Sequence, residues 1–437
     1  MSTTLTAGHA SDRPSLDDAL PAEGWQRTFA SLSNPHFRML FISMLVSFIG
    51  LHMGFMAQSA LTYKLEGNAT SLGIVVLAWG VPQMVFSLVG GVAADRINKR
   101  TIILVSQGTI GVLMLALAIS IQTGHVALWQ IAGLGFVQGT VFSFNVPARQ
   151  AWIPEIVGRD KLSNAIALNS SGFNMASVAG PFLAGGLITV PFIGFSGVYF
   201  IMAGCFFAVV LLLLRTPADG AEPREATGSS VTEDMKEGVN YVRAHSALMT
   251  MLAMGFVVIV LGMPYRTLFP VFAGEIYDVG SVGLGAMYTA GGIGALVGSL
   301  LVAMWSQSPN KGRLQLISAV GFAATLVVFA MINWYPLGLV TLAMMGLLSM
   351  GFVALNNTMV LSASEPEYYG RVQSVYMLSW SVQPFAAMPI AVLADVWGAQ
   401  YAVALSGVIV AAAILGVRAY AAARGPAREA LASADVT

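Results

Sequence analysis

Residues 90–100 read GGVAADRINKR, and four of the six side chains at positions 95–100 are charged. The stretch directly before them, residues 70–94, has no charged residue. Only 10 % of the whole chain is charged and 56 % is hydrophobic, whereas soluble domains have about 25 % charged residues. A charge cluster directly behind a long uncharged run indicates the end of a membrane-spanning helix.

The rest of the chain repeats this pattern of long uncharged runs. A run of about 20 apolar residues can cross the ~30 Å hydrocarbon layer as a helix. The apolar runs exclude a transmembrane β-barrel, whose strands are short and alternate polar with apolar residues. The sequence therefore predicts an all-α membrane protein with twelve transmembrane helices, near residues 39–63, 70–94, 101–122, 126–147, 163–189, 192–214, 247–271, 281–305, 314–334, 336–360, 372–394 and 398–417.

The polar segments divide these spans into two sets of six. We expect a leader at 1–38 without the features of a removable signal peptide, a six-helix bundle at 39–214 and a second one at 247–417. Between the bundles, 215–246 is a Pro/Gly/Ser-rich linker followed by a short helix, and 418–437 is a tail. Matching landmarks recur 210 to 212 residues apart: Gly73 with Gly283, Lys99 with Lys311, and Gly158 with Gly370. This offset is about half the chain and predicts two similar halves, as in many transporters.

The distribution of lysine and arginine predicts the orientation in the membrane. If both termini are cytoplasmic, only Lys64 and Arg266 fall on the opposite side, as the positive-inside rule requires. We therefore expect a multi-pass protein of the cell membrane, plasma or inner, with cytoplasmic termini. Cys205 is the sole cysteine, so an intrachain disulfide is excluded.

The opening stretch resembles the cytoplasmic motif of the major facilitator superfamily, G-x-x-x-D-R-x-x-[R/K]-[R/K]. Its positions are filled here by Gly91, Asp95, Arg96, Lys99 and Arg100. The resemblance implies that the glycine lets helices approach, and that the aspartate and arginine form a gating clamp between two bundles. The corresponding stretch of the second half, AMWSQSPNKGR, lacks both the aspartate and the adjacent arginine.

A longer stretch, residues 144–188, resembles the drug- and siderophore-exporter branch of that superfamily. The matching elements are Pro147–Arg149, Asn164–Ser170 and Gly180–Pro181. The resemblance implies two pseudo-symmetric six-helix bundles that rock about a central cavity, and export of a small amphipathic molecule by alternating access. The expected partners are the lipid bilayer and that substrate, with protons as a candidate coupling ion, and the chain is expected to act as a monomer.

Spans one, four, seven and ten line the cavity in the family, so polar side chains on one face of these spans are candidates for substrate contact. Span one offers Gln58, span four Gln138 and Asn145, and span ten Ser349 and Asn356. The alternative for each is packing between helices, where small and polar residues are also common.

Three ionisable groups in or beside the spans are further candidates. His52 and Asp395 are the candidate proton carriers, although His52 also suits a neutral role inside the first bundle. Arg266 lies within span seven, where a charge is costly and usually faces water or a partner. We expect one of two roles for Arg266. It is either a cation that attracts anionic substrates or pairs with Asp395, or an anchor whose side chain reaches the outer membrane surface.

The remaining motifs exclude other classes of protein. No Walker A loop and no Cys/His cluster is present, so we expect no nucleotide hydrolysis, no metal, no cofactor, no enzymatic activity and no nucleic-acid partner. Two alternatives to export stay open. One is an uptake carrier for a small anionic metabolite, and the other is a substrate sensor that does not transport.

Overall fold

A computed structural model describes residues 30–215, 231–304 and 310–434. The described residues are almost entirely helical and contain no strand. Most of the predicted leader (residues 1–29) and the first part of the predicted linker (216–230) lie outside the described residues, as do the side chains of a few helical residues, Asp95 among them.

Three helices of the first half begin at asparagine caps. The side chains of Asn34, Asn68 and Asn98 accept hydrogen bonds from backbone N–H groups in the first turns of α2, α3 and α4, which satisfies donors that a helix start leaves unpaired. After the short helix η2 (Ala30–Ser33), this half consists of α2 (Pro35–Glu66), α3 (Ala69–Arg96), α4 (Lys99–Gln122), α5 (Leu128–Thr189) and α6 (Gly194–Leu214).

The long helix α5 comprises two membrane crossings. Gly158 has φ 71°, a left-handed conformation that glycine adopts without steric cost, and it separates a first limb (128–158) from a second limb (159–189). Eleven helices of the described chain are long and apolar enough to span a membrane, and the first limb is one of them. The second limb is more polar, but together with those eleven it gives the twelve predicted crossings.

The second half repeats this plan, with a break in its first span. Its elements are α7 (Val231–Ala244), α8 (Ser246–Phe256), η3 (Val257–Gly262), η4 (Met263–Leu268), α9 (Phe269–Val271), η5 (Phe272–Ile276), α10 (Gly280–Met304), α11 (Lys311–Met331), α12 (Tyr335–Ser362), η6 (Pro366–Tyr368), α13 (Tyr369–Trp397) and α14 (Ala399–Ala434). The predicted tail, 418–437, continues as helix through Ala434.

Proline explains why the span from Ser246 to Ile276 is irregular. It passes through π and 3-10 segments around Pro264 and Pro270, because proline has no N–H to donate and its ring clashes with the carbonyl four residues earlier. For Pro270 that carbonyl belongs to Arg266, and it accepts hydrogen bonds from the Phe269 backbone N–H and from the Tyr288 hydroxyl (3.4 Å). Broken helices of this kind often line transporter binding sites.

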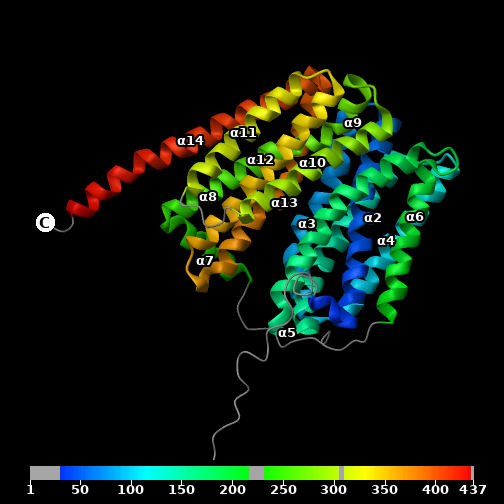
Figure 1. The fold of residues 1–437 in the computed structure, drawn as a ribbon, viewed down its shortest axis with the longest axis horizontal. Coiled ribbons are helices and arrows are strands. Elements are labelled where there is room, and N and C mark those ends of the chain that lie inside the picture. Colours follow the sequence, from blue (N-terminus) through cyan, green and yellow to red (C-terminus); the bar gives the residue numbers. More distant parts are fainter. Residues whose placement is uncertain (1–29, 216–230, 305–309, 435–437) are drawn as a thin grey trace, which may run out of the picture.

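Among the described residues, the two halves form separate bundles that meet toward one end of the molecule. Figure 1 shows their helices converging near α9 and α10 and diverging toward α5 and α7. We call the end at which α6 finishes and α7 begins the linker end, and the opposite one the far end. One hydrophobic cluster joins residues of both bundles in the far half, whereas two separate clusters, one in each bundle, occupy the linker half.

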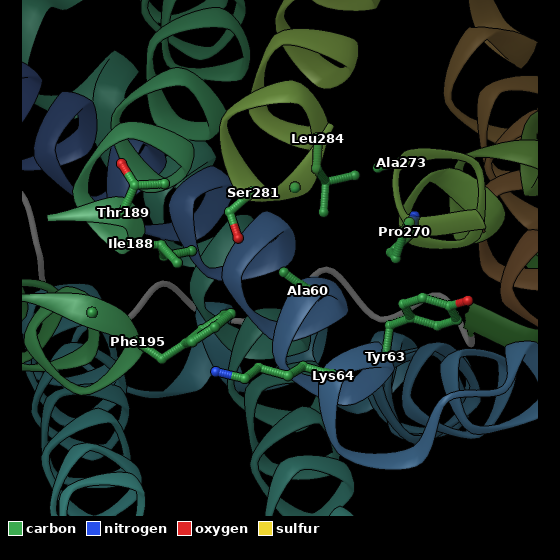
Figure 2. A pocket seen from close by; sticks show the side chains of 13 residues that line it. Ala60, Tyr63, Lys64, Ile188, Thr189, Phe195, Pro270, Ala273, Ser281 and Leu284 are labelled. Carbon is green, nitrogen blue, oxygen red and sulfur yellow. The ribbon is translucent and has the colours of Figure 1, made fainter. Parts of the chain in front are cut away.

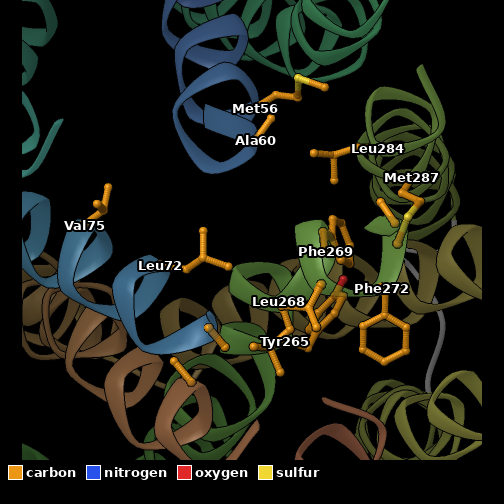
Figure 3. Packing of buried hydrophobic residues seen from close by; sticks show 14 of the residues in the cluster. Met56, Ala60, Leu72, Val75, Tyr265, Leu268, Phe269, Phe272, Leu284 and Met287 are labelled. Carbon is orange, nitrogen blue, oxygen red and sulfur yellow. The ribbon is translucent and has the colours of Figure 1, made fainter. Parts of the chain in front are cut away.

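An apolar layer closes the space between the bundles at the far end. We call it the far-end layer (Figure 3). Most of its side chains are fully buried, so the bundles exclude water from this region by close packing. Its members are Met56, Ala60, Leu72 and Val75 of the first half and Tyr265, Leu268, Phe269, Phe272, Leu284 and Met287 of the second.

Candidate functional site

Polar contacts reinforce the far-end layer. The Asp395 carboxylate, at the end of α13, accepts hydrogen bonds from the backbone N–H groups of Ala69 (2.7 Å) and Thr70 (2.8 Å) and from the Thr70 hydroxyl. These donors form the first turn of α3, where the helix dipole favours a negative charge. The Tyr63 hydroxyl donates to Glu275 across the same gap (2.5 Å). The far end is therefore closed by both apolar and charged contacts.

Glycines let the bundles come this close. A Cβ on Gly80 of α3 would lie 2.2 Å from the Cβ of Pro384 in α13, and one on Gly185 of α5 would lie 3.1 Å from the Cα of Gly285 in α10. Neither position has room for a larger side chain without moving the helices apart. The closed far end thus depends on small residues at helix crossings, as is common in membranes.

A shallow pocket of about 460 Å³ lies between the bundles at the far end (Figure 2). Ala60, Tyr63 and Phe195 line it from the first half, and Pro270 and Leu284 from the second. The Lys64 ammonium lies 5.2 Å from the centre of the Phe195 ring, a cation–π contact. Ala60 and Leu284 also belong to the far-end layer, so the pocket borders that layer.

Two of the three cations of the predicted gating motif, Lys99 and Arg100, contact their own bundle in this conformation. Lys99 is buried and its ammonium lies 3.3 Å from Glu155, while Arg100 donates to the carbonyls of Leu213 (3.0 Å) and Leu214 (2.7 Å). Arg96 is exposed, and a Cβ on Gly91 would meet no atom within 4 Å. Lys99 and Arg100 are therefore bound within the first bundle in this conformation.

The polar candidates of spans one and four are buried among helices. The Gln58 side-chain amide donates to the Ile131 carbonyl (3.1 Å), and Gln138 is buried nearby on the same limb of α5. Asn145 accepts a hydrogen bond from the Nε of Arg149 (2.8 Å). Gln58 therefore joins α2 to α5, whereas the Asn145 bond lies within the first limb of α5.

Arg149 is a buried arginine that belongs to the matching element Pro147–Arg149 but was not among the candidate site residues. It is 3 % exposed and also donates to the Ser47 hydroxyl (3.2 Å), which accepts a further bond from Gln107 (2.9 Å). Its Nη1 has no partner among the described residues. The predicted span ended at residue 147, which left Arg149 in a loop; the helix in fact continues past Pro147 to Gly158.

The second bundle has a matching polar cluster without the arginine. Gln315 donates to Asn356 (2.6 Å), and these residues stand 208 and 211 positions after Gln107 and Asn145. Val360 occupies the place 211 positions after Arg149. Ser349 is buried, and its hydroxyl donates to the Gly346 carbonyl (3.2 Å).

The three ionisable candidates are not brought together. Asp395 contacts the start of α3, as described above, and not Arg266. Arg266 is half-buried beside Tyr265, whose hydroxyl lies 3.5 Å from its Nε. His52 lies in the middle of α2 against Phe173, with a ring-to-ring distance of 5.0 Å. No group of three potential metal ligands occurs among the described residues.

Comparison with known proteins identifies the family. Residues 26–435 match the transmembrane secretion effector family of the major facilitator superfamily. The chain belongs to this family. The enterobactin exporter EntS of Shigella boydii serotype 18 and that of Escherichia coli O1:K1 are each 27 % identical over 346 residues, which cover 79 % of this chain and 81 % of the relative.

Solved structures share the fold at much lower identity. The nucleoside transporter NupG aligns with a TM-score of 0.65 at 15 % identity, covering 88 % of this chain and 98 % of NupG. A POT family transporter aligns with a TM-score of 0.70 at 11 % identity, covering 88 % and 95 %. The chain is thus a multi-pass membrane transporter of the major facilitator fold and not an enzyme, which confirms the predicted family and fold class.

Proposed function

We propose that the protein is a secondary active exporter that moves a small amphipathic molecule out of the cytoplasm by alternating access. One observation carries the proposal: the bundles are sealed at the far end and separate at the linker end. Such a one-sided closure is what one half of a rocking cycle requires. The relatives, which are enterobactin exporters, support the direction.

The charges support a cytoplasmic linker end. Lysines and arginines gather there, while Lys64 and Arg266 are the exceptions on the far side, in accordance with the positive-inside rule. The conformation described above, which is closed at the far end, would then be open to the cytoplasm and ready to accept a substrate from inside. The membrane would be the plasma or inner membrane, with both termini inside.

The orientation can be tested by labelling. Because Cys205 is the sole cysteine, Cys205→Ser gives a cysteine-free background in one step. Single cysteines at His125 and Asn310 would then report on the two ends. A membrane-impermeant maleimide should label the His125→Cys variant in intact cells and the Asn310→Cys variant only in inverted vesicles. The reverse pattern would overturn the assigned orientation.

Transport itself is tested by counterflow in proteoliposomes with enterobactin, a set of amphipathic drugs and small organic anions. We expect exchange of at least one compound, and accumulation in inverted but not right-side-out vesicles when the gradient is imposed. Binding without counterflow would instead mark a sensor, and accumulation in right-side-out vesicles an uptake carrier. Asp95→Asn should impair exchange and leave binding intact, if Asp95 acts in the gate.

A further inference from the structure

A continuous series of aromatic rings lies on the first bundle at mid-membrane depth. We call it the aromatic band, and its members are Phe48, His52, Phe55, Trp79, Phe142 and Phe173. Successive ring centres are 5.2 Å apart for Phe48 and Phe173, 5.0 Å for Phe173 and His52, 6.2 Å for His52 and Phe55, 5.5 Å for Phe55 and Trp79, and 5.8 Å for Trp79 and Phe142. The rings come from α2, α3 and both limbs of α5.

The helix faces that hold these rings point toward the second bundle. On α2, Phe48, His52 and Phe55 share a face with Ser59, whose hydroxyl lies 3.3 Å from the Tyr288 hydroxyl of α10. On α3, Trp79 follows Leu72 and Val75 of the far-end layer at positions of the same face. The band therefore continues the inter-bundle surface from the closed far end into the linker half, where the bundles diverge (Figure 1).

The second limb of α5 also turns the face that holds its ring toward the second bundle. Phe173 lies one turn before Ser177, whose carbonyl would be 3.2 Å from a Cβ on Gly292 of α10. Phe55 and Trp79 are about 16 Å from the far ends of their helices at 1.5 Å per residue. That is about half the thickness of the hydrocarbon layer, the depth at which transporters bind substrate.

The band is not an ordinary part of the core. Phe55, Trp79, Phe142 and Phe173 belong to none of the hydrophobic clusters found among the described residues, and Phe173 is 40 % exposed. Trp79 Nε1 and His52 Nε2 are buried without a hydrogen-bond partner in the described part of the chain. An indole N–H can only donate, and leaving it unpaired is costly.

We propose that the aromatic band is a binding surface for a flat aryl group that carries a carboxylate. The aryl ring would stack on the half-exposed rings, and the carboxylate would accept the unpaired N–H of Trp79. Arg266, whose carbonyl accepts a hydrogen bond from the Tyr288 hydroxyl that contacts Ser59 of α2, would favour the negative charge from the second bundle. The inference rests on the proposed function, since it places the substrate between the bundles in the linker half.

Binding of 2-naphthoate to the full chain in lipid nanodiscs tests this inference, with decahydro-2-naphthoate as the saturated control. We expect about tenfold tighter binding of the aromatic compound. Phe173→Leu should weaken binding of 2-naphthoate about three- to tenfold, as the loss of one aromatic contact implies. Phe182→Leu, on the same limb but 63 % exposed, is the matched control and should leave it unchanged.

A second variant separates the hydrogen bond from the stacking. Trp79→Phe keeps a ring and removes the N–H, so it should weaken 2-naphthoate and leave 2-methylnaphthalene unaffected. It also provides an independent reading if Phe173→Leu does not reconstitute. Equal affinity for the aromatic and saturated acids, or equal losses in Phe173→Leu and Phe182→Leu, would overturn the inference.

The proposal of export and the proposal of the aromatic band as a binding surface can be refuted independently of each other. Counterflow of another compound with no preference for aryl carboxylates would refute the aromatic band and leave the exporter intact. Binding of 2-naphthoate with the expected dependence on Phe173 and Trp79, but without counterflow of any compound, would support the binding surface and refute export.

Discussion

At the scale of single residues, Arg149 is a charge held inside the first bundle by neutral partners. Its guanidinium donates to Asn145 and Ser47. Removing the guanidinium leaves the side-chain oxygen of Asn145 buried without a donor, which lowers the free energy of unfolding by about 1–3 kcal/mol. We therefore expect Arg149→Met to lower the unfolding temperature in detergent by several degrees.

The double variant Arg149→Met/Asn145→Leu tests the explanation, because it removes donor and acceptor together. It should unfold at a higher temperature than Arg149→Met, since replacing both partners by apolar groups can be nearly neutral. If the losses of unfolding temperature caused by the two single substitutions simply add in the double variant, the hydrogen bond does not account for the stability of the cluster.

Arg266 is expected to select substrates by charge. Arg266→Lys keeps the cation but loses the planar fork that binds carboxylates with two hydrogen bonds, so affinity for an anionic ligand should fall moderately. Arg266→Gln should reduce it about tenfold or more, with little change for a neutral ligand. Lys64→Gln, which removes the other far-side cation, is the control. Parallel losses for both ligands that follow protein abundance would mean that Arg266 is only an anchor.

How far the sequence predicts such sites depends on what each signal measures. The motif residues and the asparagine and glutamine candidates are visible as polar groups in apolar runs. Their partners are not, because Gln58 meets Ile131 and Gln315 meets Asn356 only through helix packing. Arg149 could have been found by allowing the helix to continue past Pro147, since a proline inside a membrane helix is tolerated when neighbouring groups satisfy the backbone.

At the scale of elements, Asp395 acts as a latch between α13 and α3. Its carboxylate caps the first turn of α3, an interaction of charge with helix dipole worth about 0.3–2 kcal/mol. Asp395→Asn should therefore favour opening of the far end. We expect a severalfold faster reaction of a cysteine placed at Leu72, in the Cys205→Ser background, with a maleimide added from the far side.

The matched control for this latch is Asp278→Asn. Asp278 is an exposed far-end carboxylate with φ 50°, a conformation that asparagine also tolerates. Its replacement removes the same charge without touching α3. Equal acceleration in both variants would assign the effect to net charge and not to the latch.

The spans themselves were predictable, because twenty apolar residues have few alternatives to a membrane helix. The break between the spans predicted at 314–334 and 336–360 is found where α11 ends at Met331 and α12 begins at Tyr335. Hydropathy does not report on backbone geometry. The irregular helix from Val257 to Ile276 was therefore not predicted, although Pro264 and Pro270 are visible in the sequence. The sequence also does not determine which end is closed, since both states of a carrier use the same residues.

At the scale of the whole molecule, opening of the far end must occur in every cycle if the bundles rock. A Cβ on Gly73 of α3 would lie 3.0 Å from the Cβ of Ala391 in α13, close to the 3.5–4.5 Å separation of disulfide-bonded cysteines. In the Cys205→Ser background, Gly73→Cys/Ala391→Cys should therefore form a disulfide between the bundles on oxidation. The oxidised protein is expected to lose counterflow, regain it with a reductant, and still bind ligand from the linker end.

The two single variants, treated identically, control for oxidation elsewhere. Undiminished exchange by the fully cross-linked protein would show that the far end stays closed during transport, and rocking of rigid bundles would then be the wrong description of this carrier.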